Sequence, residues 1–292
     1  PMGFAGDERR EVDVQDGEPV YFIIDGSGED GIFDFNRGLG CRGERLFGEA
    51  AEYAAKMANR IRIITPDPHI NAIAQSLSLA ENGAWDEDKG VYMHGAIGWR
   101  MPLNGWRGAY LGDLIGEHGR ERRFLENYAA SQVTNCPCSL GAQQDFGLGN
   151  ARPMKRWGTP MYSDGYICRN PNDASKMHHY DMNLIYIDAL MRHLRWTGDK
   201  EFARRMWPVI TRHLAWEKMA FDANGDHLYD AVCGIWASDA LQYNGGEVTH
   251  SSAYNAFHNK CAAEIAEWVG EDPAPYRAEA AAIGNALRER LW

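Results

Sequence analysis

The chain has 292 residues and a formal net charge of -11 at pH 7. This negative charge argues against a nucleic-acid partner, which would favour a basic face, and the sequence holds no apolar run long enough to span a membrane. Hydrophobic residues make up 45% of the chain, enough for a sizeable core in one large domain or two ordinary ones. The six scattered cysteines do not form the pattern of a disulfide framework.

The first 44 residues lack a helical pattern. Residues 20–24 (VYFII) form a short β-rich run, and glycines and acidic turn residues follow it. We interpret residues 1–44 as the end of a β domain and a linker. No signal peptide is visible, but Pro1 is not a natural start, so a leader could have been removed. We expect a secreted or periplasmic protein rather than a cytoplasmic one.

From residue 45 the apolar residues follow a helical period. Asp67 can cap a helix whose first turn holds Pro68 and which ends at Asn82-Gly83. Gly270 is placed to end a helix as a C-terminal glycine does. The pattern predicts a mostly α fold with further helices at 45–60, 117–133, 183–196, from 199 to Met206, from Pro208 onward, 251–269 and 275–292.

Aromatic and acidic residues gather in the irregular stretches that precede these helices. The stretches are residues 90–113, 134–177 and 234–250, and loops held by rigid helices often carry binding and catalytic residues. Aromatic faces suit sugar rings, although a well-packed core accounts for aromatic residues as well.

The alternation of helix, aromatic loop and helix resembles the six-hairpin glycosidases. The segment TGDKEFARRMWPVITRHLAWE at 197–217 and the helix at 251–269 carry this resemblance most specifically. The family comprises (α/α)6-toroid enzymes such as trehalases, glucoamylases and α-L-rhamnosidases. The resemblance covers residues 45–292 and implies a toroid-type catalytic domain that is incomplete in this chain. The remainder would come from a missing C-terminal part or from another chain.

Glycoside hydrolysis generally needs two carboxyl groups that flank the scissile bond. Asp239 lies between Trp236 and Tyr243, and burial among aromatic rings can keep such an acid protonated. The resemblance also places the general acid at Asp239. Glu247, after a pair of glycines, and Asp181, before a helix, are the other catalytic candidates. Each of the three could instead cap a helix or form an ion pair.

The resemblance further implies a carbohydrate partner. The segment around Trp106 and Arg107 resembles the one with which six-hairpin enzymes hold a terminal sugar. The sequence therefore predicts a glycoside hydrolase that cleaves a terminal sugar from an oligo- or polysaccharide, with no cofactor and no metal. The expected substrate-binding residues are Trp99, Trp106, Arg107, Tyr162, Asp164, His178, His179, Trp236 and Tyr243.

Two other functions stay open at this point. His178, His179 and Tyr180 are residues that a toroid polysaccharide lyase or a sugar epimerase would use, and a helical array could also bind glycans without catalysis. Residues 222–226 (DANGD) look like the start of a calcium loop. They lack its glycine at position six and its glutamate at position twelve, so we interpret them as a turn.

Overall fold

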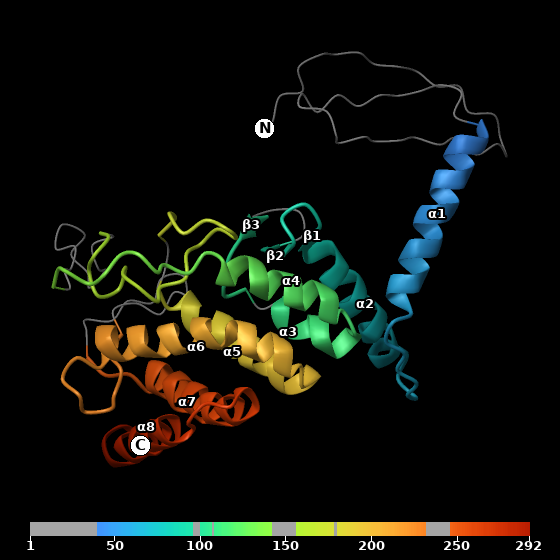
Figure 1. Ribbon diagram of the computed structural model, residues 1–292. Helices are drawn as coiled ribbons and strands as arrows, with labels where there is room; N and C mark the ends of the chain where they lie inside the picture. Colours follow the sequence, from blue (N-terminus) through green and yellow to red (C-terminus); the bar gives the residue numbers. More distant parts are fainter. Residues whose placement is uncertain (1–39, 96–99, 107, 142–155, 178–179, 232–245) are drawn as a thin grey trace. The chain divides into compact units, whose positions relative to one another are not determined.

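The computed structural model describes residues 40–95, 100–106, 108–141, 156–177, 180–231 and 246–292. The chain divides into two compact units, residues 1–79 and 80–292. Helix α1 (Gly40–Ala58) lies in the first unit, and α2 (Pro68–Ala84) starts there (Figure 1). Asp67 Oδ1 accepts a hydrogen bond from the His69 backbone N–H at 2.8 Å, which confirms the predicted cap. Of the β-rich segment and linker predicted for residues 1–44, residues 1–39 lie outside the described residues, and residues 40–44 belong to α1.

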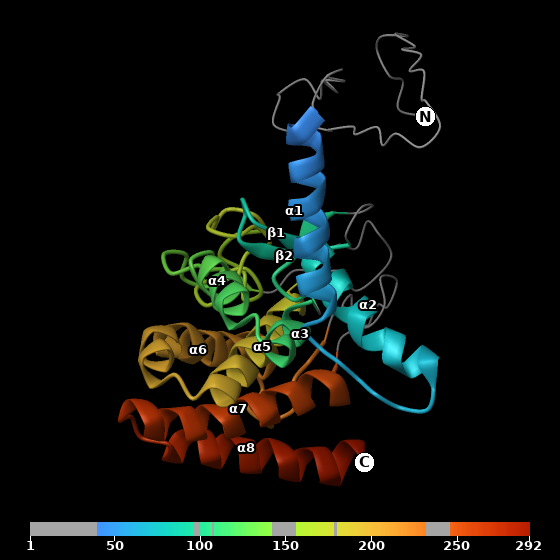
Figure 2. The same cartoon turned by 90° about the vertical axis from the view of Figure 1, so that its right-hand side faces the viewer.

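The second unit is an array of antiparallel helix pairs. A short turn at Gly198 joins α5 (Met182–Thr197) to α6 (Lys200–Phe221), and another at Gly270 joins α7 (Thr249–Val269) to α8 (Ala274–Ala286). As a result α5 and α7 run in one direction, while α6 and α8 run back (Figures 1 and 2). Gly270 has a φ of +88° and ends α7, as the sequence predicted.

The described part of this unit has four further helical elements. They are α3 (Ala109–Gly112), the 3-10 turn η1 (Asp113–Ile115), α4 (His118–Ala129) and the π-helical turn η3 (Leu287–Leu291). Helix α5 packs against α4, α6 and α7, and α7 also packs against α6 and α8. The prediction of a mostly α, toroid-like fold is confirmed at this level.

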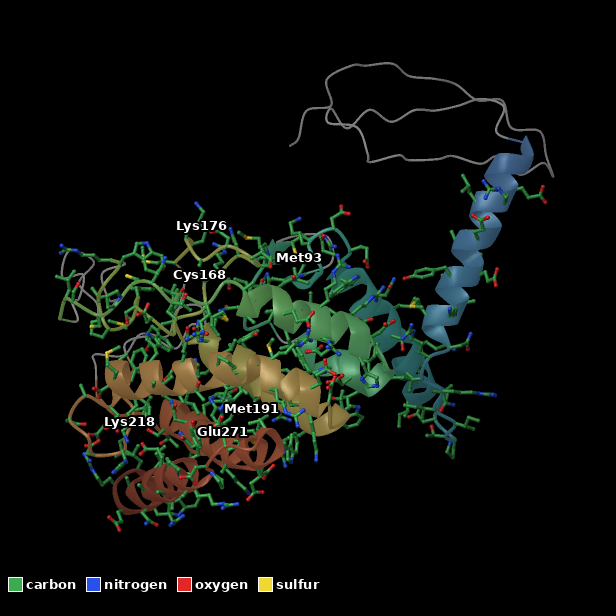
Figure 3. The ribbon with its side chains drawn as sticks, in the orientation of Figure 1. Met93, Cys168, Lys176, Met191, Lys218 and Glu271 are labelled. Carbon is green, nitrogen blue, oxygen red and sulfur yellow. The ribbon has the colours of Figure 1, made fainter. Side chains whose placement is uncertain are left out.

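The core of the unit forms around α5. Its Leu190, Met191 and Leu194 side chains are fully buried, and Figure 3 labels Met191. Phe124 of α4 and Ile265 of α7 belong to the same apolar cluster. Because α5 is buried on nearly every side, its position sets the spacing of the neighbouring helices.

The prediction that one helix stops near Met206 and another begins at Pro208 is wrong. Helix α6 runs unbroken from Lys200 to Phe221 with Pro208 inside it. A proline cannot donate a hydrogen bond to the carbonyl four residues earlier, here that of Arg204. Both residues are exposed, so water can solvate that carbonyl. The buried side of the helix meanwhile continues past the proline through Val209.

Residues 90–113 were expected to be a loop, but they contribute most of a small antiparallel sheet. Its strands are β1 (Trp85–Asp86), β2 (Val91–His94) and β3 (Met101–Pro102), in the order β1-β2-β3. Trp85 pairs with Tyr92, and Met93 pairs with Pro102. Strand β2 packs against α4 with its first three residues buried, so packing rather than alternation determines this strand.

The long irregular segment is held by hydrogen bonds from helix side chains to its backbone. The Asn183 amide of α5 accepts from the Ile167 N–H at 2.6 Å and donates to the Ile167 carbonyl at 2.9 Å. Asn104 donates to the same carbonyl at 3.0 Å. Trp216 of α6 donates to the Pro160 carbonyl at 2.8 Å. These bonds fix residues 156–177 next to the first turn of α5.

Replacing Gly165 with alanine should destabilise the protein more than replacing Gly116. Both glycines have a positive φ, +101° and +82°, where a side chain costs roughly 1–2 kcal/mol. At Gly165 an added Cβ would also lie 2.5 Å from the Trp216 Cβ and 2.6 Å from the Arg212 carbonyl oxygen, whereas nothing lies within 4 Å at Gly116. We expect an extra loss of about 1–3 kcal/mol for Gly165→Ala.

Urea denaturation of the two variants measures this difference in the free energy of unfolding. Equal losses for Gly165→Ala and Gly116→Ala would contradict the close approach of residue 165 to α6.

Candidate functional site

Several of the predicted site residues that the structure describes lie around the starts of α3 and α5. Trp106 comes just before α3, and Asp181 immediately precedes α5. A Cβ on Gly105 would lie 2.5 Å from the Met182 carbonyl oxygen, so the chain at Trp106 passes directly beside the first turn of α5. Tyr162 belongs to the same apolar cluster as Met182. The structure therefore brings Trp106, Tyr162 and Asp181 to one end of the array.

These residues differ in how accessible they are. Trp106 is half-buried, with its ring centre 4.0 Å from that of His94 in an edge contact. Tyr162 is fully buried and packs its ring against Tyr166 at 5.2 Å. Asp164 Oδ1 accepts a hydrogen bond from the Cys136 N–H at 2.6 Å. Trp106 can thus offer a ring face to a ligand, while Tyr162 and Asp164 make contacts that stabilise the irregular segment.

A buried carboxyl group lies behind Asp181. Asn255 of α7 donates a hydrogen bond to Glu217 Oε2 at 3.1 Å, and Glu217 is almost fully buried in α6. Burial raises the pKa of Glu217 to about 8, and the nearby Asp181 charge acts in the same direction. Glu217 therefore carries its proton at neutral pH. It links the start of α5, the end of α6 and the start of α7 as an uncharged group.

Two buried histidines continue this polar layer between α6 and α7. The rings of His213 and His258 lie 6.0 Å apart, and neither is exposed. Burial lowers the pKa of both, that of His258 to about 4. Both rings are therefore uncharged near pH 7.

A cavity of about 990 Å³ runs along α3, α5 and α7. Tyr110 of α3 and His250 of α7 line it near the starts of their helices. The lining combines aromatic rings with charged side chains. Its principal residues are Tyr110, Asp113, Asp188, Arg192, Trp196, His250, Tyr254 and Phe257.

Asp188 is the centre of the charged group in this cavity. Its Oδ2 accepts a hydrogen bond from the Tyr110 hydroxyl and another from Arg192 Nε, both at 2.7 Å. The Arg192 guanidinium carbon lies 5.4 Å from the centre of the Tyr110 ring. Burial and the bond to Asp188 raise the pKa of Tyr110 far above its ordinary value, and that bond also raises the pKa of Arg192. Tyr110 thus keeps its proton and Arg192 its charge, which suits both for binding hydroxyl groups.

The Glu247 carboxylate already has a strong partner. Arg290 donates to its two oxygens at 2.8 and 2.6 Å, which ties the start of α7 to the end of the chain. Tyr180, part of the lyase alternative, is fully buried and stacks on Phe221 at 4.6 Å. The remaining predicted site residues lie outside the described part of the chain. They are Trp99, Arg107, His178, His179, Trp236, Asp239 and Tyr243.

The residues that line the cavity were missed by the sequence analysis, although a signal was present. Asp188, Arg192 and Trp196 recur every fourth residue and so share one face of α5. His250 and Tyr254 have the same spacing on α7. The abundance of apolar residues between 183 and 196 obscured this polar stripe.

Comparison with known proteins supports the fold only. No family model matches the chain, and no curated protein matches it. The structure is similar to the crystal structure of a GH78 family rhamnosidase of Bacillus sp. GL1, with a TM-score of 0.54 and 18% sequence identity. The match covers 78% of this chain and 21% of that chain, so this chain spans about a fifth of the rhamnosidase. At this identity the likeness shows a shared helical fold.

Among the described residues, no helix is both long enough and apolar enough to cross a bilayer.

The buried Glu217 should make stability fall as the pH rises. Its pKa is about 8 in the folded chain against an ordinary value of 4.5, so between these values the folded state holds a proton that the unfolded state lacks. The stabilisation is complete below about pH 4.5 and is lost as the pH rises through 8, with a slope of up to ~1.4 kcal/mol per pH unit. Glu217→Gln cannot lose that proton, so we expect a flatter profile.

Urea denaturation between about pH 5 and pH 8 measures both profiles. Glu271→Gln is the control, because Glu271 is exposed and should keep the slope of the unaltered chain. If Glu217→Gln also keeps that slope, Glu217 is not the buried acid described above.

Proposed function

We propose that this chain forms part of a glycoside hydrolase that removes a terminal sugar from an oligo- or polysaccharide. One observation carries the proposal. The aromatic and charged cavity along α3, α5 and α7 includes Tyr110 in α3 and His250 in the first turn of α7, close in sequence to the predicted sugar-binding segment at Trp106 and to the predicted acid-bearing segment before α7. The fold shared with a rhamnosidase adds support, because glycosidases are built on this arrangement of helices.

The cavity has the size and chemistry for a sugar. Small-molecule sites typically enclose about 300–1,000 Å³, and this one has about 990 Å³. The Tyr110 and Tyr254 rings provide surfaces for the apolar faces of a pyranose. Arg192 and Asp188 provide a donor and an acceptor for its hydroxyl groups. In this proposal, Trp106 contacts the sugar at the end of the cavity, together with Trp99 and Arg107.

The described residues on either side of 232–245, the segment that contains Asp239, bond to each other. The Ala231 N–H donates to the Gly246 carbonyl at 3.0 Å. The Val248 N–H then donates to the Tyr229 carbonyl at 3.1 Å, immediately before α7 begins. His250, which lines the cavity, lies in the first turn of that helix. The proposal that Asp239 supplies an acid to a bound sugar is supported by the short stretch of chain between Gly246 and His250, a residue that lines the cavity.

In the proposed reaction Asp239 protonates the leaving oxygen of the glycosidic bond. A second carboxylate activates water or attacks the sugar. Asp181 and Glu247 are the candidates for this role. Asp181 is buried beside Glu217, and Glu247 would have to exchange Arg290 for substrate or water. A secreted or periplasmic location would fit a substrate of this kind.

Replacing Asp239 with asparagine should lower kcat by about 10²–10⁴-fold, the usual contribution of a general acid. The assay measures release of the aglycone from a panel of aryl glycosides by the complete gene product, and the panel includes a rhamnoside because of the structural likeness. Glu271→Gln serves as the control, since Glu271 is exposed and lies at the far end of α7.

Normal turnover by the Asp239→Asn variant would exclude Asp239 as the acid. Lack of turnover of every glycoside by the unaltered protein would exclude the hydrolase itself. Retained binding of a glycan in that case would support the non-catalytic alternative.

A further inference from the structure

A second cluster of polar side chains lies between the end of α6 and α8, away from the cavity. It begins at the turn after α6, residues 222–227. The first five of these residues resemble the start of a calcium loop in sequence. Asp222 is 4% exposed, and its Oδ1 accepts a hydrogen bond from the His227 N–H at 3.1 Å. His227 has a φ of +66°, a conformation that only a few non-glycine residues adopt. The turn thus folds back and brings the His227 side chain close to Asp222.

Helix α8 supplies a third group to this turn. Glu279 Oε1 lies 3.3 Å from His227 Nδ1, and its Oε2 accepts a hydrogen bond from Lys218 Nζ. One ligand atom from each of Asp222, His227 and Glu279 lies within 4.8 Å of the others. The turn after α6 and helix α8 thus bring two carboxylates and a histidine nitrogen together.

An unsatisfied buried atom distinguishes this cluster from an ordinary surface ion pair. Asp222 Oδ2 is buried, and none of the residues that the structure describes donates a hydrogen bond to it. A buried carboxylate oxygen without a partner is costly, and a metal ion is one of the groups that removes this cost. Lys218 Nζ donates its hydrogen bond to Glu279. Among the described residues, the Lys218 side chain forms no hydrogen bond with Asp222 Oδ2.

We propose that Asp222, His227 and Glu279 bind a divalent transition-metal ion of the Zn²⁺ type. Zn²⁺ accepts histidine nitrogen together with Asp or Glu oxygen, and three protein ligands leave a position for water. Ca²⁺ takes six to eight oxygen ligands, and Mg²⁺ keeps an octahedral shell rich in water, so a histidine-containing group of three suits neither.

The Lys218 ammonium contacts one of the proposed ligands, Glu279. Figure 3 labels Lys218 at the end of α6, and its side chain is 45% exposed. It can therefore swing into solvent when a dication replaces it at Glu279. The bound ion would join the end of α6 to α8. Arg290 bridges Asp226 and Glu247 in the same region, so the ion would reinforce the connection between α6 and α7.

The test uses the purified chain after removal of metals with a chelator. Calorimetric titration with Zn²⁺ should give one site per chain, and thermal unfolding should show a higher Tm with Zn²⁺ present. Ca²⁺ and Mg²⁺ should produce neither effect. His227→Ala and Glu279→Gln should each weaken Zn²⁺ binding by about 100-fold or more. Substitution of a residue that only hydrogen-bonds to a metal ligand already lowers metal affinity by about 10–100-fold. Lys218→Met should strengthen binding, because the competing ammonium is gone.

His118→Ala is the matched control. His118 Nδ1 also contacts a carboxylate, that of Asp113 at 2.8 Å, but this pair lies outside the proposed site. It should bind Zn²⁺ as the unaltered chain does. Circular dichroism of each variant establishes that it is folded, and Glu279→Gln preserves the side-chain shape if His227→Ala does not fold. Equal Zn²⁺ binding by folded Glu279→Gln, weaker binding by Lys218→Met, or a preference for Ca²⁺ would each overturn the proposal.

Discussion

The hydrogen bonds between the Asn183 amide and the Ile167 backbone are the contact on which the candidate site depends. Residues 156–177 form little regular structure, so their backbone groups need partners from elsewhere. Asn183 satisfies both polar groups of Ile167, and Asn104 shares the same carbonyl. This arrangement ties the approach to α3 and the irregular segment to the first turn of α5. The side chains around Trp106 and Asp181 take their positions from it.

The polar groups beneath this end differ in charge from those in the cavity. Glu217 and His258 are buried and neutral at pH 7, because burial moves the pKa of each toward its uncharged form. Asp188 and Arg192, by contrast, form a hydrogen-bonded pair within the cavity lining. Helix α7 faces the neutral layer with Asn255 and the cavity with Tyr254. One helix can therefore join a rigid interior to a ligand-binding surface, since residues on different faces meet different surroundings.

Sequence patterns predicted the helices well where apolar residues dominate. They did less well where a single residue, such as a proline, was taken to mark the end of a helix. The periodic apolar residues of α5 and the glycine after α7 predicted both helices closely. Pro208 suggested a break, because the sequence does not show that the Arg204 carbonyl faces water. The strand at 91–94 was missed because its first three residues are buried together rather than alternately.

The candidate site was harder to predict, since it depends on contacts between distant segments. The bond from Tyr110 to Asp188 joins residues 78 positions apart, and the closeness of Gly105 to Met182 has no local signal. Burial likewise cannot be judged from a motif. Tyr162 is as aromatic as Trp106, yet it is fully buried. Trp236, Asp239 and Tyr243 lie outside the described residues, so the role predicted for them from sequence stays a prediction.

The central claim is that the cavity along α3, α5 and α7 holds the terminal sugar. The most direct measurement is a crystal structure of the protein soaked with the monosaccharide product of the glycoside that it hydrolyses. The account predicts electron density for the sugar ring within hydrogen-bonding distance of Arg192 or Asp188 and packed against Tyr110 or Tyr254. Density for the sugar at another surface, with this cavity empty, would contradict the account.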